Sequence, residues 1–235
     1  EAKSKILKLY GDGKINGIIS AGGGTGTHIC TTIMRELPLG IPKVMVSTVA
    51  SRNMAKTVGT KDITMIHSVA DLLGVNSVSG RILDKAAAGI CGMVQSRWKP
   101  QEAKKRIALP FFGFITAGAE ATKEALEKLG YEVVAFHANG IGGMAMEELA
   151  SEGYFHGILD LATHELADAL MDGYCGGIGP GRFEPPRENK FPGWSHRGGL
   201  TVPYSNLRAS TFRKNTETAR FSFMISDPPS ASHVK

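Results

Sequence analysis

The sequence is organised around the stretch Ser20-Ala21-Gly22-Gly23-Gly24-Thr25-Gly26-Thr27. An apolar run at residues 15–19 precedes it, and Ile29, Ile33 and Leu37 follow it at helical spacing. This order predicts a strand, a glycine turn and a helix. Glycine has no Cβ to hold a ligand away from the backbone, and the first N–H groups of a helix lack intrahelical partners and favour negative charge. A phosphate therefore fits at this turn.

The glycine turn differs from the two common nucleotide-binding motifs. No Gly-Lys-Ser/Thr follows it, as a Walker loop requires, and the third glycine of a dinucleotide fingerprint would fall at Thr27 or Ile29. The alternative is a tight turn without a ligand, but such a turn rarely needs three consecutive glycines and a fourth. We therefore predict a nucleotide phosphate site that consists of Gly22, Gly23, Gly24, Thr25, Gly26 and Thr27.

A second element of this site is predicted after the next strand. Residues 43–49 have the apolar character of a buried parallel strand, and the polar loop at residues 50–60 contains Arg52. In a doubly wound sheet this loop lies beside the glycine turn, at the carboxyl ends of the strands. We predict that Arg52 contacts the phosphates; the alternative is a solvated loop arginine.

Residues 106–181 repeat the alternation of strands and helices, which predicts a parallel sheet with right-handed crossovers. The expected fold is α/β, with two Rossmann-like parallel-sheet subdomains and a largely irregular C-terminal tail. The expected boundaries are 1–98 for the first, nucleotide-binding subdomain, 99–105 for a charged linker, 106–181 for the second subdomain and 182–235 for the tail.

A second glycine turn, Gly140-Ile141-Gly142-Gly143, again separates a strand from a helix. It predicts a second anion site built from Thr116, Asn139, Gly142 and Gly143. His137 and Asp160 lie at the ends of successive strands, at the carboxyl edge of the sheet, so they are candidate catalytic residues, acting as base and orienter. The alternative is that both residues brace their own turns, because no nucleophile or metal-ligand set completes the group.

Composition and charge narrow the functional classes. The chain is 42% hydrophobic and 21% charged, with a net charge of +5. Residues 1–180 contain 18 basic and 18 acidic side chains, so the excess lies in the last 55 residues and gives no support for direct nucleic-acid binding. No apolar run is long enough to span a membrane. The three isolated cysteines, Cys30, Cys91 and Cys175, predict reduced thiols in a cytoplasmic protein and no metal site.

The tail predicted at residues 182–235 contains six of the eleven prolines and little apolar periodicity. Only residues 221–225 resemble a strand. We expect most of it to lack regular structure, and residues 187–235 to be dispensable.

Three stretches in the same order resemble the family of the tomato mosaic virus resistance protein, with its Tm-type ATP-binding domain. They are Gly22 to Thr27 with residues 37–51, Phe136-His137-Ala138-Asn139-Gly140-Ile141-Gly142-Gly143 with residues 145–149, and residues 157–168. The resemblance covers residues 5–180. It implies two Rossmann-like subdomains, ATP at the first, with Mg²⁺ as a possible companion, and a homodimer in the full-length protein. It also implies antiviral defence through binding of a viral replication helicase.

The chain departs from this family at its beginning. Family members have a further strand, helix and strand ahead of the position of Glu1, so the resemblance implies a first subdomain that is truncated at its N-terminus. That unit normally supplies part of the ATP site, and weak ATP affinity is therefore expected.

Three functions are consistent with these features. The first is an ATP-binding domain with a regulatory role in protein interaction. The second is a ligase-like or hydrolytic enzyme that uses the cleft between the subdomains, with His137 and Asp160. The third is tubulin-type GTP binding, because Gly22 to Gly26 also resembles the tubulin signature. That family needs several strand–helix units ahead of the stretch, which residues 1–14 do not supply.

Overall fold

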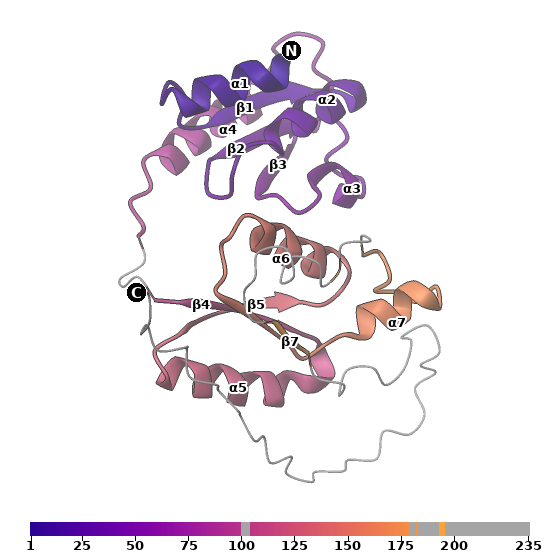
Figure 1. The fold of residues 1–235 in the computed structure, drawn as a ribbon. Helices are drawn as coiled ribbons and strands as arrows, with labels where there is room; N and C mark the ends of the chain where they lie inside the picture. Colours follow the sequence, from indigo (N-terminus) through magenta and orange to yellow (C-terminus); the bar gives the residue numbers. More distant parts are fainter. Residues whose placement is uncertain (100–103, 179–181, 183–192, 196–235) are drawn as a thin grey trace.

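The computed structural model describes residues 1–99, 104–178, 182 and 193–195, and these form two parallel sheets (Figure 1). The first sheet has the order β1-β2-β3, with β1 (Ile18–Gly22), β2 (Lys43–Ser47) and β3 (Ile63–His67). The second has the order β5-β4-β6-β7, with β4 (Arg106–Phe111), β5 (Glu132–His137), β6 (Gly157–Asp160) and β7 (Gly193–Ser195). All neighbouring strands are parallel. The predicted α/β fold with two Rossmann-like units is confirmed.

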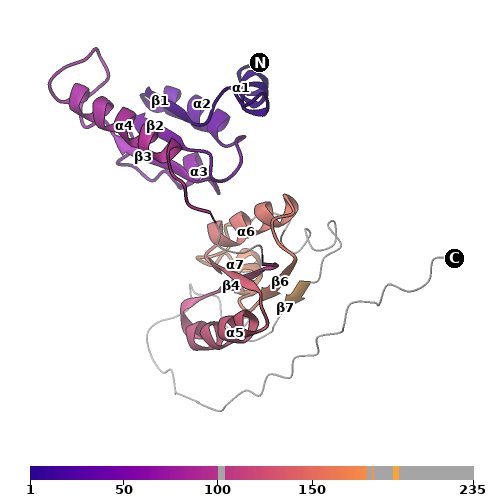
Figure 2. The ribbon, with the colours of Figure 1, turned by 90° about the vertical axis from the view of Figure 1, so that its left-hand side faces the viewer.

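Helices surround each sheet separately (Figure 2). With the first sheet lie α1 (Ala2–Gly11), α2 (Gly24–Met34), α3 (Ala55–Val58) and α4 (Ser79–Val94). With the second lie the 3₁₀ turn η1 (Gly113–Ile115), α5 (Thr116–Lys128), α6 (Ile141–Ser151) and α7 (His164–Leu170). The helix predicted after the first glycine turn begins inside it, at Gly24, because glycine also adopts helical backbone angles.

The first sheet is covered on both faces. Side chains alternate along a strand, so β2 sends Met45 to one face and Val44 and Val46 to the other. Met45 packs with Met34 of α2 and Ile63, whereas Val44 and Val46 pack with Ala86 and Ile90 of α4. All five residues of β2 are buried, which explains its nearly continuous apolar sequence.

The second sheet has the same three-layer arrangement, with α5 and α6 on opposite faces (Figure 1). Met146 and Ala150 of α6 pack on Ala108 of β4 and Ile158 of β6. On the other face, Ala119 of α5 packs with Leu109 and Leu161. The carboxyl ends of β4, β5 and β6 therefore meet at one edge, between these two helices.

The sequence from residue 182 onward is not irregular throughout. Arg182 is buried in the second subdomain, and Gly193–Ser195 pairs with β6 as a fourth parallel strand. The largely irregular tail predicted from residue 182 therefore begins with a buried arginine and includes a short strand. A three-residue strand is too short to leave a periodic signal in the sequence. The remainder of the predicted tail, including residues 221–225, lies outside the described residues.

Polar contacts join the crossover between β2 and β3 to helix α6. Lys61 Nζ lies 2.6 Å from Glu148 Oε1 and 3.1 Å from Glu152 Oε1, and the Thr60 hydroxyl donates to Glu148. Burial alone would raise the pKa of Glu148, but the hydrogen bonds from Lys61 and Thr60 lower it below its ordinary value. The two subdomains therefore meet through a charged contact.

Candidate functional site

The first glycine turn connects β1 directly to the start of α2. Gly23 is the N-cap residue in an extended conformation, and α2 begins at Gly24, so the first free N–H groups of the helix belong to the glycine stretch. Gly23, Gly24 and Thr25 are exposed. This geometry presents backbone donors and the positive end of the helix dipole to solvent at the carboxyl edge of the sheet.

Buried hydroxyl groups connect the turn to the neighbouring strand β2. The Thr27 hydroxyl lies 2.6 Å from the Ser47 hydroxyl, at the end of β2, and both residues are buried. The backbone N–H of Thr48 donates to Gly22 O at 3.2 Å. Thr27 was predicted as a phosphate ligand; its hydroxyl bonds β2 instead, and its backbone N–H donates to Gly23 O at 2.8 Å. Its direct contact with a phosphate stays a prediction.

The glycines of this turn leave space outside the backbone. A Cβ added at Gly24 or Gly26 would meet no atom within 4 Å, apart from the helix itself. A Cβ at Gly22 would lie 3.2 Å from Gly26 Cα, so Gly22 is required for the close turn. Packing within the fold therefore explains the glycine at position 22. The open space at Gly24 and Gly26 leaves room for a ligand against the backbone.

Two further polar residues lie at the same edge. Arg52 is exposed in the loop after β2, and its backbone N–H donates to Val49 O at 3.0 Å. Gly22, Ser47 and His67 are register partners at the ends of β1, β2 and β3. His67 therefore ends β3 at the same edge of the sheet as the glycine turn.

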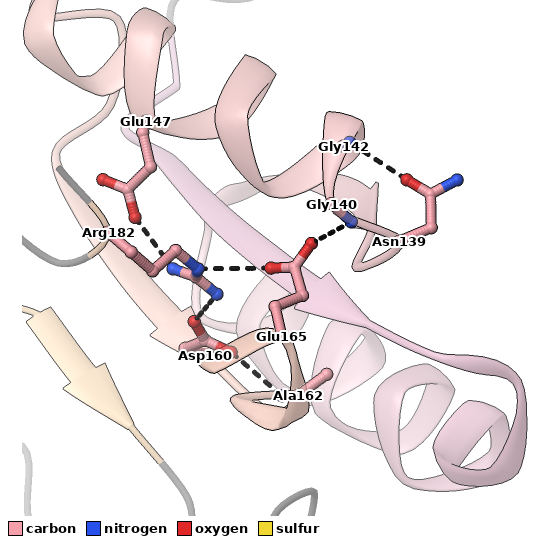
Figure 3. A network of polar contacts seen from close by, with 8 residues as sticks. All are labelled: Asn139, Gly140, Gly142, Glu147, Asp160, Ala162, Glu165 and Arg182. Carbon is pink, nitrogen blue, oxygen red and sulfur yellow. Dashed lines mark hydrogen bonds and ion pairs between the residues drawn. The ribbon is translucent and has the colours of Figure 1, made fainter. Parts of the chain in front are cut away.

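The second glycine turn is closed by the protein's own side chains (Figure 3). Gly140 has a φ of +91°, and its N–H donates to Glu165 Oε1 at 2.5 Å. The Asn139 side chain accepts from the N–H of Gly142 at 3.0 Å. A Cβ at Gly143 would lie 2.7 Å from Glu165 Oε1. The Glu165 carboxylate thus occupies the position where an anion would meet Gly140, and the second anion site stays a prediction.

Arg182 lies among three buried carboxylates (Figure 3). Its guanidinium is 2.8 Å from Glu147 Oε1, 2.5 Å from Asp160 Oδ2 and 3.2 Å from Glu165 Oε2. Burial raises the pKa of Glu165, whereas the charge of Arg182 and the Gly140 N–H act against that rise. Burial alone would lower the pKa of Arg182, but Asp160 and Glu165 raise it. We refer to Glu147, Asp160, Glu165 and Arg182 as the arginine cluster.

The candidate catalytic residues His137 and Asp160 have separate surroundings. Asp160 is buried and bonds Arg182 and the N–H of Ala162, the latter at 2.9 Å. His137 is exposed, and its ring stacks on Phe112 with centroids 5.2 Å apart. Thr116 donates to Gly113 O at 2.9 Å. Within the described residues these contacts match the alternative in which His137 and Asp160 brace their own surroundings, and a catalytic role stays a prediction.

Sequence reasoning missed Arg182 and Glu165, although the sequence contains a signal for them. Between Lys128 and Arg182 there are eight acidic residues and no lysine or arginine. Some of these acids lie on strands and helices that must be buried, and buried carboxylates require a positive partner. The first basic residue that follows is Arg182.

In the part of the chain that the structure describes, no group of three or more histidine, cysteine, aspartate or glutamate side chains is placed to hold a metal ion. No helix in that part is long and apolar enough to cross a membrane.

Two family models match the chain in succession. The N-terminal domain of the uncharacterised protein family UPF0261 matches residues 1–99, and the C-terminal domain of the same family matches residues 104–202. The chain belongs to the UPF0261 family. This agrees with the resemblance to the tomato mosaic virus resistance protein, because both bacterial UPF0261 proteins and tomato Tm-1 proteins are among the relatives.

The relatives are considerably longer than this chain. A UPF0261 protein of Clostridium tetani is 45% identical over 188 residues, which cover 80% of this chain and 46% of the relative. The tomato (Solanum lycopersicum) ToMV resistance protein Tm-1(GCR237) is 40% identical over 199 residues, covering 82% of this chain and 26% of the relative. The ToMV susceptible protein tm-1(GCR26) is 39% identical, with 80% and 26% covered. The UPF0261 chain thus spans half or less of these relatives.

Proposed function

We propose that this UPF0261 chain binds ATP at the first glycine turn and uses it to regulate a protein interaction. The observation that carries the proposal is the open backbone at Gly24 and Gly26, where α2 begins. Helix N–H groups and the dipole favour the phosphates there, and Arg52 adds a positive charge from the neighbouring loop.

The chemistry at this turn favours binding over hydrolysis. Residues 48–53, which follow β2, include hydroxyls and Arg52 but no carboxylate. A hydrolytic site normally holds Mg²⁺ through a carboxylate and positions a water molecule. Mg²⁺ would accordingly enter with the phosphates of ATP and find its protein ligands among the hydroxyls of this edge, such as that of Thr25.

The crossover after β2 provides a route from the nucleotide to a partner. It begins beside Gly22, carries Arg52 and α3, and ends at Thr60 and Lys61, which contact α6. Ordering of residues 50–60 by ATP would therefore reach the second subdomain. Two tomato relatives are named for resistance or susceptibility to ToMV. By that resemblance we propose a cytoplasmic homodimer that takes part in antiviral defence and whose protein partner is a viral replication helicase.

Calorimetry with ATP tests the nucleotide site. The variant Gly24→Val places a β-branched side chain in the open space where the phosphates would lie, and we expect at least a tenfold loss of affinity. Gly89→Val is the matched control, because a Cβ at this exposed α4 position also meets nothing within 4 Å. Equal affinity for ATP in the two variants would show that the glycine turn is not the site.

Two further measurements distinguish the other functions. Tighter binding of GTP than of ATP would favour the tubulin-type reading. Hydrolysis on the order of 1 per second, abolished in His137→Ala or Asp160→Ala, would favour an enzyme. The Asp160 variant must be compared with Glu147→Ala, because both lose a carboxylate of the arginine cluster and only Asp160 is a candidate orienter.

A further inference from the structure

Two adjacent side chains in the second subdomain have buried polar atoms that lack hydrogen-bond partners. They are the Thr163 hydroxyl and His164 Nε2, and each residue is only 5% exposed. Among the residues that the structure describes, neither atom has a hydrogen-bond partner. Most buried polar groups are paired, and an unpaired one costs about 1–3 kcal/mol. Two such atoms side by side therefore require an explanation.

The chemistry of the pair follows from the other contacts of His164. Its ring is hydrogen-bonded to the backbone of Ala138, and since Nε2 is unpartnered, Nδ1 carries the donated proton. Burial lowers the pKa of His164, and the charge of Arg182 acts in the same direction, whereas Asp168 and Asp160 act against it. The ring is therefore neutral near pH 7. Its Nε2 presents a lone pair, and the Thr163 hydroxyl beside it can either donate or accept.

The pair lies where ligands bind in parallel sheets. Phe112 follows β4, His137 ends β5 and Thr163 and His164 follow β6, so all belong to the carboxyl edge of the second sheet. The Phe112 ring packs against His164, with centroids 4.7 Å apart, and it also stacks on His137, with centroids 5.2 Å apart. Phe112 therefore contacts both buried His164 and exposed His137.

We propose that Thr163 and His164 form a binding site for a hydroxyl group of a small neutral molecule, which enters when Phe112 moves aside. A hydroxyl matches both atoms, because it donates to His164 Nε2 and exchanges a hydrogen bond with the Thr163 hydroxyl. An anionic group such as a phosphate lacks the proton that Nε2 requires. It would also approach Asp160 and Asp168, while Arg182 is already bound to three carboxylates.

The test is nuclear magnetic resonance of the full chain labelled with ¹⁵N-histidine. Three small probes share a three-carbon frame: glycerol is neutral, serinol is cationic and glycerol 3-phosphate is anionic. We expect glycerol to shift the His164 Nε2 resonance saturably, and the anionic probe to bind at least tenfold more weakly. Thr163→Val preserves the shape but removes the hydroxyl, and it should weaken glycerol binding about tenfold. His28→Gln, at an exposed position of α2 in the first subdomain, is the control and should leave binding unchanged.

Each remaining outcome overturns the proposal. If none of the probes shifts the Nε2 resonance, the pair holds a trapped water only. A tighter response to glycerol 3-phosphate would assign this edge to the predicted anion site, and a tighter response to serinol would assign the pair to an ammonium group. Phe112→Leu tests whether glycerol enters past Phe112. Exchange of glycerol between the free and bound states should be faster in this variant, and an unchanged exchange rate would contradict the role of Phe112. Retention of the resonance dispersion of the parent chain establishes that each variant is folded.

Discussion

The two glycine turns of this chain have similar sequences and opposite surroundings. Both follow a parallel strand and begin a helix of eleven residues. At Gly24 the space beside the backbone is open, whereas Gly140 and Gly143 face the carboxylate of Glu165. A glycine turn before a helix therefore predicts an anion beside it, and at the second turn that anion is a carboxylate of the protein itself. The position of the nearest buried acid distinguishes the two cases.

The largest expected effect comes from adding one methyl group at each turn. Gly142→Ala would overlap the carbonyl oxygen of His137, so we expect a loss of about 4 kcal/mol or more in the free energy of unfolding. Gly24→Ala should change it by no more than about 1 kcal/mol, in the stabilising direction, because Ala is the better helix former. Urea denaturation of both variants measures this difference. Similar losses would mean that the first turn is packed as tightly as the second.

The next effect compares the arginine near each turn. Arg182→Ala leaves three buried carboxylates without their cation and should destabilise the chain by about 3–5 kcal/mol. Arg52→Ala, at an exposed loop position, should leave the free energy of unfolding within about 0.5 kcal/mol. The same variant should weaken ATP binding if the proposed function holds. A destabilising Arg52→Ala would show that this arginine, too, serves the fold.

ATP itself provides a third comparison, because a ligand that binds only the folded state stabilises that state. At a hundredfold excess over Kd, ATP should raise the free energy of unfolding by about 2.7 kcal/mol. The gain should disappear in Gly24→Val and persist in Gly89→Val, in which the substituted glycine is equally open. Thermal denaturation with and without ATP gives this result directly. Stabilisation that survives in Gly24→Val would place the nucleotide elsewhere.

The pH dependence of stability sharpens the contrast further. Burial lowers the pKa of His164 below its ordinary value of about 6.5, so the unfolded chain binds this proton more readily. Stability from His164 is therefore present above about pH 6.5 and is lost as the pH falls towards the folded-state pKa, by about 1.4 kcal/mol for each unit between the two values. His164→Gln should show a shallower fall than the parent chain. Urea denaturation of both chains above and below about pH 6.5 measures the two slopes, and equal slopes would contradict the prediction.

The smallest effect concerns the contact that joins the two subdomains. Lys61→Ala removes the ion pairs with Glu148 and Glu152, and we expect a loss of about 1 kcal/mol or less because partly exposed pairs are weak. The loss should shrink in 1 M salt, where the Debye length is about 3 Å. Lys123→Ala is the control, because it breaks an exposed ion pair with Glu127 within α5 and leaves the contact between the subdomains intact. A loss above about 2 kcal/mol would indicate that the contact is a packed interface.

The sequence predicted the local parts of this fold well. Strand, turn and helix at residues 18–34 follow from apolar spacing and glycines within one short stretch, so no distant residue is needed to recognise them. The parallel sheets follow from repetition of that unit. α3 and β7 were missed because four and three residues are too few to establish a period.

The second site was harder to predict because its chemistry joins distant residues. Arg182 bonds partners 17, 22 and 35 residues earlier, and no spacing rule links such positions. His137 and Asp160 do end strands that succeed each other in the chain, β5 and β6, but β4 lies between these strands in the sheet, and Phe112 and Arg182 determine what each residue contacts. The charge balance between Lys128 and Arg182 was the one signal that pointed to a buried cation.

The place of Arg182 in the chain also affects the order in which the protein forms during synthesis. The ribosome adds every residue of the first sheet, and all the acids of the arginine cluster, before it adds the cation that neutralises them. Domains generally fold from the N-terminus during translation, at about 5–20 residues per second. The first subdomain can therefore mature on the ribosome, while the second remains an acidic, incompletely packed nascent chain until Arg182 has left the exit tunnel.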